Sequence, residues 1–161
     1  MAQRLDERLE RRERILVSGS EAVLFLNGLI TNDMKTLAVN AWMAAAFANV
    51  QGRLLAAVRI AHREDGFLID TESATRETVI TLLERFTLAG DFRLQDLTDE
   101  TAMFSLQGRN ASEIISRVFG EEAAGVERQK IVSAGFGETT VNVLRATHTA
   151  EDGFDLFIDA D

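Results

Sequence analysis

The amino-acid sequence predicts an α+β fold built from two consecutive β-α-β-β-α-β units of the ferredoxin-like kind, the second incomplete at its C-terminal end. Two observations lead to this prediction. Short apolar stretches alternate with amphipathic helical stretches, and the same order of elements begins again near residue 99. The tetrapeptide Glu-Asp-Gly-Phe also occurs twice, and its aspartates, Asp65 and Asp152, are 87 residues apart. Gly19 and Gly108, which follow the first strand of each unit, are 89 residues apart, so two landmarks indicate a duplication.

The first unit is predicted over residues 15–98. A short buried strand precedes a helix that Ser20 is expected to cap, because a serine hydroxyl accepts a hydrogen bond from the first helical turn. Asp65-Gly66 predicts a tight hairpin turn, since glycine tolerates the positive φ that such turns need. The elements are a strand at Ile15–Val17, a helix to Asn27, strands at Trp42–Asn49, Leu54–Ala61 and Phe67–Thr71, a helix to Phe86 and a strand at Phe92–Leu97.

The second unit is predicted over residues 99–161 and follows the first through β-α-β-β only. By the pattern of the first unit, one further helix and one strand would come after Asp161. Their absence would leave a sheet edge and an apolar face uncovered, so we expect a fragment of a longer protein. A short gene and a dimer partner that covers the gap are the alternatives. Residues 1–14 alternate acidic and basic side chains and predict a charged N-terminal arm.

Composition excludes several classes of function. The 161 residues are 46% hydrophobic and 27% charged, which is typical of a globular protein, and no apolar run approaches the ~20 residues of a membrane span. The net charge of −9 argues against nucleic acid as a partner. The sequence has no cysteine and two histidines, so we expect no metal site and no disulfide. A soluble cytoplasmic protein is the expectation.

No catalytic residue is predicted from the residues alone. His62 and His148 are the only imidazoles, and they occupy equivalent places beside the two predicted hairpins. A nucleophilic triad needs an imidazole beside a hydroxyl, whereas this symmetry favours a scaffold or surface role. No glycine-rich phosphate-binding motif is present.

Asp70 and Glu72 close the otherwise apolar stretch that begins at Phe67. Residues two apart on a strand share a face, so both carboxylates can point the same way. Placed beside a cavity, they would accept hydrogen bonds from the amino and ring N–H groups of a pterin or purine. The alternative is an edge strand whose charges face water.

Several motifs resemble the folate-binding family that contains the glycine-cleavage T-protein and YgfZ. The resemblance covers most of Ile15–Ala111 and extends more loosely to Asp161. Its most specific elements are Thr31-Asn32-Asp33 and Asn49-Val50-Gln51-Gly52-Arg53, and the second is closer to the YgfZ branch. The resemblance implies that the two units form part of one domain that binds tetrahydrofolate in a central cavity shared by three domains.

The family has two branches. T-proteins transfer an aminomethyl unit from a lipoyl carrier protein to tetrahydrofolate, and the resemblance places their aspartate in the helix after Phe67–Thr71. That position aligns with Val79 here, and Glu77 is the nearest acid. Valine cannot accept a proton, which favours the YgfZ-type role. The cysteine motif of the YgfZ branch would lie beyond Asp161.

Three functions follow from this resemblance. The first is a tetrahydrofolate-binding accessory factor in iron–sulfur enzyme maintenance or one-carbon metabolism, with iron–sulfur enzymes as partners. The second is an aminomethyltransferase of the glycine cleavage system, with a lipoyl carrier protein as partner. The third is a folate-free structural remnant of the fold. The predicted folate-binding residues are Asn49, Gln51, Gly52, Arg53, Asp70 and Glu72.

Overall fold

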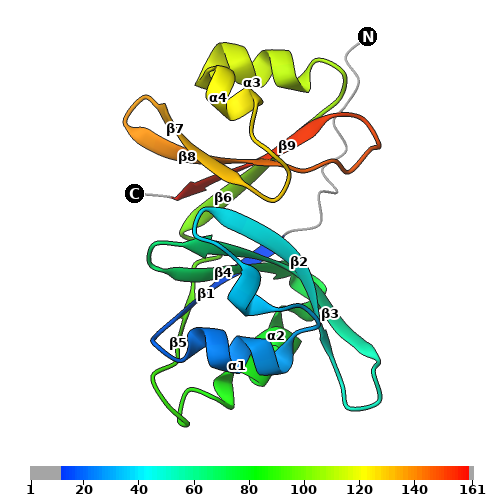
Figure 1. Ribbon diagram of the computed structural model, residues 1–161, viewed down its shortest axis with the longest axis vertical. Coiled ribbons are helices and arrows are strands. Elements are labelled where there is room, and N and C mark those ends of the chain that lie inside the picture. The colour runs from blue at the N-terminus through cyan, green and yellow to red at the C-terminus, as the bar shows by residue number, and fades with distance from the viewer. Residues whose placement is uncertain (1–11, 160–161) are drawn as a thin grey trace.

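Two antiparallel sheets lie face to face, and each carries its helices on the outer side, so the chain forms four layers (Figure 1). The computed structural model describes residues 12–159. The predicted arm therefore lies largely outside the described residues. Its last residues were assigned wrongly, because Arg12, Glu13 and Arg14 already belong to the first strand, where Glu13 and Arg14 are buried.

The first sheet has the strand order β2-β3-β4-β1-β5, with neighbouring strands antiparallel. Alternate side chains such as Ile15, Ile60 and Ile69 point toward α1 and α2 and form the larger core with them. Two 3₁₀ turns, η1 (Met34–Thr36) and η2 (Ser73–Thr75), lie in the connections. The strands and helices are β1 (Arg12–Ser18), α1 (Ala22–Leu29), β2 (Ala41–Ala48), β3 (Leu54–Arg63), β4 (Gly66–Glu72), α2 (Arg76–Glu84) and β5 (Arg93–Asp96).

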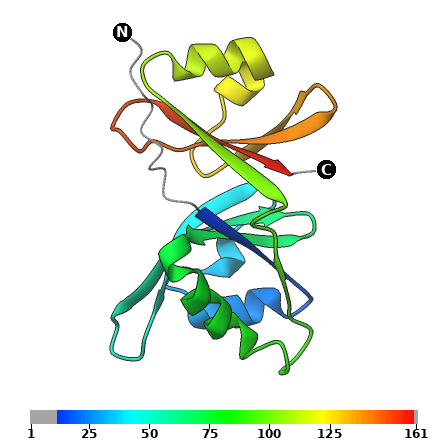
Figure 2. The same cartoon turned by 180° about the vertical axis from the view of Figure 1, so that it is seen from behind.

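The second sheet has the order β6-β9-β8-β7, and it is also antiparallel. Phe154, Val141 and Val143 form its core with Ile115 of α3 and Ala123 of α4. Figure 2 shows α3 and α4 on the side of this sheet that faces away from the first sheet. The elements are β6 (Thr101–Gln107), α3 (Ala111–Phe119), α4 (Glu121–Ala124), β7 (Ile131–Phe136), β8 (Thr139–Arg145) and β9 (Gly153–Asp159).

The number of strands in each unit differs from the predicted β-α-β-β-α-β pattern. Both sheets contain the same spatial order, β2-β3-β4-β1 in the first and β7-β8-β9-β6 in the second, and β5 extends the first sheet only. Each unit thus has one strand more than β-α-β-β-α-β assigns to it. In the first unit the extra strand is already present among the three predicted stretches Trp42–Asn49, Leu54–Ala61 and Phe67–Thr71, which correspond to β2, β3 and β4. Tight turns join β2 to β3 and β7 to β8, so both arms of each hairpin pair directly. The origin of the two sheets by duplication stays a prediction.

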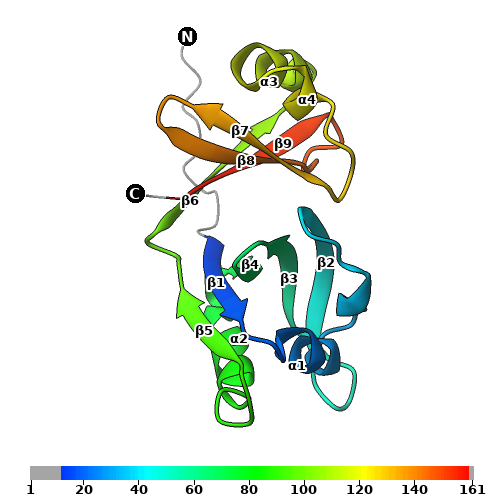
Figure 3. The same cartoon turned by 60° about the vertical axis from the view of Figure 1, so that its left-hand side comes forward.

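Backbone pairing joins the two sheets at one point. The N–H of Trp42 donates to Gln129 O over 2.9 Å, and the N–H of Ile131 donates to Asn40 O over 2.9 Å. Asn40 and Gln129 both have positive φ, at 56° and 65°. Figure 3 shows the start of β2 reaching the second sheet here, with the inner faces of the sheets opposite each other. No helix within residues 12–159 is long and apolar enough to cross a membrane.

Candidate functional site

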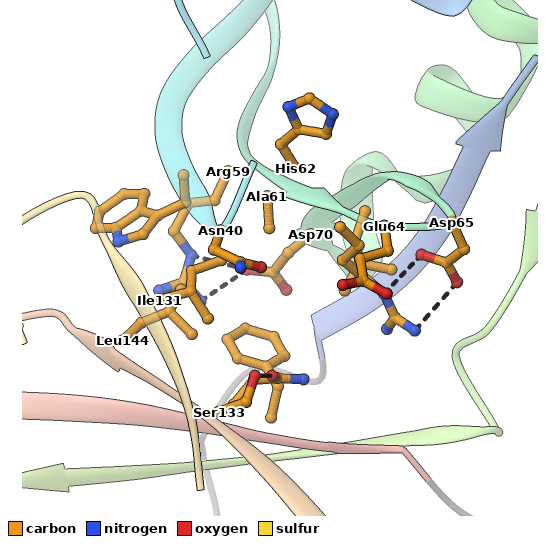
Figure 4. A pocket seen from close by; sticks show the side chains of 15 residues that line it. Asn40, Arg59, Ala61, His62, Glu64, Asp65, Asp70, Ile131, Ser133 and Leu144 are labelled. Atoms are coloured by element: carbon orange, nitrogen blue, oxygen red, sulfur yellow. Dashed lines mark hydrogen bonds and ion pairs between the residues drawn. The ribbon is translucent and has the colours of Figure 1, made fainter. Parts of the chain in front are cut away.

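A recess of about 470 Å³ lies between the inner faces of the two sheets. Figure 4 shows that its side chains come from both sheets and converge on the same space. The first sheet contributes residues from the start of β2, from β3 and from β4, and the second contributes residues from β7, β8 and β9. The lining residues used below are Trp42, Arg59, Ala61, Leu68, Asp70 and Phe157.

The period of the strands explains why polar side chains reach this recess. Ile60 and Ile69 point into the helix-covered core, so their neighbours Arg59 and Asp70 point to the opposite face. Arg59 is paired directly with Asp70 across β3 and β4. One sheet therefore presents a guanidinium and a carboxylate side by side to the second sheet.

Arg59 lies at the centre of an ion-pair network that connects the two sheets. Its Nε and Nη2 lie 2.8 Å and 2.7 Å from Asp70 Oδ2, and its Nη1 donates to Asp155 Oδ2 on β9. Arg12 Nε donates to the same Asp70 oxygen over 2.8 Å, and His148 Nε2 lies 3.0 Å from Asp155 Oδ2. Asp155 is fully buried, so its charge depends on these partners.

The ion-pair network shifts the pKa values of Arg59 and Asp155. Burial alone lowers the pKa of Arg59, but the nearby charges of Asp70 and Asp155 outweigh that effect and leave the pKa above its ordinary value. Burial likewise raises the pKa of Asp155, but the charge of Arg59 and the hydrogen bonds from Arg59, His148 and Ser105 outweigh it. The pKa of Asp155 therefore lies below its ordinary value.

Two buried polar atoms beside the recess have no hydrogen-bond partner among residues 12–159. They are Asp70 Oδ1 and Trp42 Nε1. Asp70 is only 3% exposed, and both residues line the recess. A buried polar group without a partner costs about 1–3 kcal/mol, so such atoms usually meet a ligand or an ordered water. The site thus offers one acceptor and one donor.

Apolar side chains form the remaining walls. Leu68 and Ala61 belong to the first sheet, and Phe157 comes from the second, with its ring centroid 5.7 Å from the Arg59 guanidinium carbon. His62 also lines the recess; its Nδ1 donates to Leu37 O over 2.9 Å, and its ring centroid lies 4.4 Å from that of Phe67. A flat ring with polar edges would suit such a recess.

Among residues 12–159, no group of three or more His, Cys, Asp and Glu side chains is arranged to hold a metal ion. Arg59 and Asp70 of the recess are instead engaged in ion pairs.

The structure separates the predicted folate-binding residues. Asp70 lines the recess, but Glu72, two residues further along β4, does not. The idea that this strand lies at an edge with its charges in water is wrong, because β4 is the central strand of five. Asp70 is buried there by the second sheet.

Asn49, Gln51, Gly52 and Arg53 form the turn between β2 and β3, at the other end of the hairpin from the recess. Asn49 Oδ1 accepts from the N–H groups of Gln51 and Arg53 at 3.0 Å and 2.9 Å, and Gly52 has a φ of +76°. Turn geometry thus accounts for the asparagine and the glycine. Arg53 precedes Arg59 by six residues, about 20 Å of extended chain at ~3.3 Å per residue.

Arg59, Trp42 and Asp155 belong to the site but are not among the residues predicted from the sequence. A signal for Arg59 existed, since it is the one charged residue in the apolar stretch Leu54–Ala61. Asp155 had the same signal in Phe154–Ile158, but nothing in the sequence indicated that it pairs with Arg59, 96 residues away.

The position of Val79 also changes the argument from the family resemblance. Val79 is fully buried in the core between α2 and the helix-facing side of the first sheet. The recess is on the opposite side of that sheet, so no side chain at position 79 would reach it. Glu77 is exposed on α2. The identity of residue 79 therefore does not count against transferase chemistry in the recess.

A family model and the curated relatives point to the same family. A family described as GCVT N-terminal domain matches residues 9–161. An aminomethyltransferase of Thermotoga maritima is 30% identical over 149 residues, which is 90% of this chain and 40% of that protein. An aminomethyltransferase of Rubrobacter xylanophilus is 27% identical, over 87% of this chain and 38% of that protein. The chain thus spans about two-fifths of the curated relatives that it matches.

Solved structures agree on the fold. The glycine cleavage system aminomethyltransferase T from Bartonella henselae superposes with a TM-score of 0.79 at 17% identity, over 94% of this chain and 40% of that chain. A chain of the heterotetrameric sarcosine oxidase from Corynebacterium sp. U-96 gives a TM-score of 0.56 at 11% identity, over 92% of this chain and 72% of that chain. Both similarities concern the fold alone.

Proposed function

Because the chain belongs to the GCVT N-terminal domain family, we propose that its inter-sheet recess binds the pterin ring of tetrahydrofolate as part of an aminomethyltransferase. The observation that carries this proposal is Asp70 Oδ1, a buried carboxylate oxygen beside the recess with no partner among residues 12–159. The curated relatives named above are aminomethyltransferases, and they support the transferase over the accessory role.

The hydrogen-bonding groups and apolar walls of the recess fit a pterin ring. The 2-amino group and ring N–H groups of a pterin are donors, and Asp70 Oδ1 is an acceptor in need of one. The indole N–H of Trp42 is the complementary donor, which suits a ring nitrogen or carbonyl oxygen. Phe157 and Leu68 would pack against the faces of the ring, and the volume of about 470 Å³ is within the ordinary range for small-molecule sites.

Asp70 would act as a positioning group. Its other oxygen, Oδ2, accepts from both Arg12 and Arg59, which fixes the carboxylate plane. A ring bound to Oδ1 would therefore have a single orientation. When bound, tetrahydrofolate would supply the nitrogen that receives the one-carbon unit, and a lipoyl carrier protein would be the donor. We assign Asp70 to binding, with no proton transfer.

The accessory role in iron–sulfur enzyme maintenance shares the folate-binding step and differs in lacking transfer. Valine at position 79 was one of its two supports, beside the YgfZ-like sequence Asn49–Arg53, and that support is removed by the burial of Val79 on the far side of the sheet. An assay for aminomethyl transfer from a lipoyl carrier protein distinguishes the two. Folate binding without transfer would favour the accessory role.

The binding test compares Asp70→Asn with Glu72→Gln by titration calorimetry with tetrahydrofolate. In Asp70→Asn the amide oxygen will face the two arginines, so the amide nitrogen will replace Oδ1 and place a donor against the donors of the ring. Loss of a hydrogen bond to a charged acceptor corresponds to about 1.5–3 kcal/mol, or roughly a 10- to 100-fold weaker Kd.

Glu72→Gln is the matched control, since Glu72 is on the same strand and does not line the recess. Its Kd should change less than about twofold. Circular dichroism and thermal unfolding of both variants show whether they are folded. Equal affinities for wild type and a folded Asp70→Asn variant would refute the proposed site.

A further inference from the structure

Strand β6 has an open edge at the end of the second sheet. In the order β6-β9-β8-β7 it pairs with β9 on one side, and no strand within residues 12–159 pairs with its other side. The strand at the corresponding position of the first sheet, β1, has β4 on one side and β5 on the other. We propose that the open edge of β6 pairs with β6 of a second copy of this chain, antiparallel and around a two-fold axis at Phe104. This inference goes beyond the proposed function and concerns a surface outside the recess.

Backbone groups of β6 are available at this edge. In an antiparallel pair the backbone N–H and C=O groups of successive residues point alternately toward the partner strand and away from it. Gln107 is the register partner of Gly153, whose C=O accepts the N–H of Ala146 over 3.0 Å and therefore points away from β6. The two-residue period then directs the backbone groups of Met103 and Ser105 away from β9 as well. A further strand could pair with these groups.

The sequence of β6 lacks the features that usually keep an open edge unpaired. Its seven residues, Thr-Ala-Met-Phe-Ser-Leu-Gln, include no charged residue and no proline. Phe104 lies opposite Leu156, which packs against the helix-side core, so the ring of Phe104 is on the outer face of the sheet. The helices do not cover it there, and Phe104 is 57% exposed. An exposed aromatic ring on an uncharged edge strand favours pairing with another strand.

A two-fold axis at Phe104 matches the available backbone groups. Antiparallel pairing around this axis places Met103 of one copy opposite Ser105 of the other, and the two residues would exchange N–H···O=C hydrogen bonds. Phe104 then lies opposite Phe104 of the second copy in a non-hydrogen-bonded pair, in which the Cα atoms are about 4.5 Å apart and the side chains lie closest. Aromatic pairs of this kind stabilise strand pairing. Each contact occurs twice, as a two-fold interface requires.

The charges at the two ends of β6 are complementary in this arrangement. Glu100 immediately precedes the strand and is exposed. Arg109 follows the strand, its side chain is 90% exposed, and its Nε lies 3.4 Å from Glu151. Antiparallel pairing brings the beginning of one strand beside the end of the other, so Glu100 of each copy would lie near Arg109 of the other. This complementarity favours a second copy over an unrelated strand, which would need matching charges of its own.

Sedimentation velocity of the intact chain, without folate, tests the proposal. One strand edge and one aromatic pair bury less than the ~800 Å² per partner of a standard interface, so we expect a Kd on the order of 10–100 μM. The average mass should rise from that of one chain toward that of two across this range. Hydrogen exchange of the Met103 and Ser105 amides should slow over the same range, because pairing protects them. A chain that stays monomeric would overturn the inference and leave the proposed function untouched.

Two sets of variants locate the interface. Phe104→Lys should weaken the dimer at least about tenfold, since it removes the aromatic pair and places like charges opposite each other. Phe136→Lys is the matched control, because Phe136 is 59% exposed on β7 at the other edge of the same sheet, and it should leave the Kd unchanged. A dimer weakened by Phe136→Lys and not by Phe104→Lys would overturn the inference.

The charge pairs test the two-fold register. Glu100→Arg and Arg109→Glu should each weaken the dimer about threefold, and the double variant should recover the wild-type Kd, because each pair again joins opposite charges. A double variant no tighter than the two single variants would overturn the proposed register. Circular dichroism shows that each variant is folded. Protection of the Met103 and Ser105 amides that is independent of concentration would assign the edge to an intramolecular partner and overturn the inference.

Discussion

Replacement of Arg59 by methionine should lower the free energy of unfolding by about 3 kcal/mol. Arg59 is the only bridge between the buried carboxylates of Asp70 and Asp155 that the described residues contain, and its side chain is 14% exposed. Removal of one partner from a buried ion pair costs about 3–5 kcal/mol, because the remaining charge has lost its compensation. We expect the lower end, since Arg12 and His148 remain beside the two carboxylates.

Urea unfolding followed by Trp42 fluorescence and circular dichroism measures this loss. With a slope of about 2 kcal/mol per molar urea, a loss of ~3 kcal/mol moves the midpoint by about 1.5 M. Arg117→Ala is the control, because its exposed pair with Glu113 should contribute less than about 0.5 kcal/mol. A loss below about 1 kcal/mol in Arg59→Met would refute the view that this network holds the sheets together.

The same network predicts a dependence on pH. The pKa of Asp155 is lowered in the folded chain, since Arg59 and the hydrogen-bond donors outweigh the opposing effect of burial. A lowered carboxyl pKa contributes stability above the pKa of the unfolded chain, about 4, and that contribution is lost as the pH falls through the folded pKa. Wild-type stability should therefore decline below about pH 4, and Asp155→Asn should make the decline shallower.

Two further predictions concern the hairpins. Asn49→Ala should cost about 1 kcal/mol in urea unfolding, because Asn49 accepts two turn N–H groups, but it should leave the Kd for tetrahydrofolate unchanged, because the turn is distant from the recess. A tenfold weaker Kd would restore this turn to the site. Gly66→Ala should cost more than about 2 kcal/mol, since the new Cβ would lie 2.4 Å from Val17 O at a φ of +147°. Gly28→Ala, which meets nothing within 4 Å in helix α1, is its control and should stabilise by about 0.5–1 kcal/mol.

Sequence and structure agree where the signals are local. The Asp65-Gly66 turn follows from the backbone freedom of glycine, and the strands on either side of it follow from their alternation. Gly52 and Asn49 belong to a turn for the same reason, although the family resemblance assigned them to ligand binding. The conformation of such turns depends on residues that are close together in the sequence, so the sequence alone can predict them.

The N-terminus of α1 shows where prediction from neighbouring residues fails. Ser20 was expected to cap α1 with its side chain, but its hydroxyl donates to Asp91, 71 residues away. A capping serine accepts a backbone N–H with its hydroxyl oxygen, whereas Ser20 donates to a tertiary partner, and Glu21 occupies the N-cap position in its place. The helix begins at Ala22 without a side-chain cap.

The sequence by itself determined the order of strands and helices, the inward or outward alternation along each strand, and the resemblance to a family. It did not determine which face of each sheet packs against helices and which face packs against the other sheet. Only the packing of the two sheets face to face, with helices outside, separated Asp70 from Glu72 as the carboxylate that lines the recess and placed Val79 in the core on the opposite side of the first sheet. The pairing of Arg59 with Asp155 depends on packing between residues 96 apart, and periodicity along a strand contains no information about such distant partners.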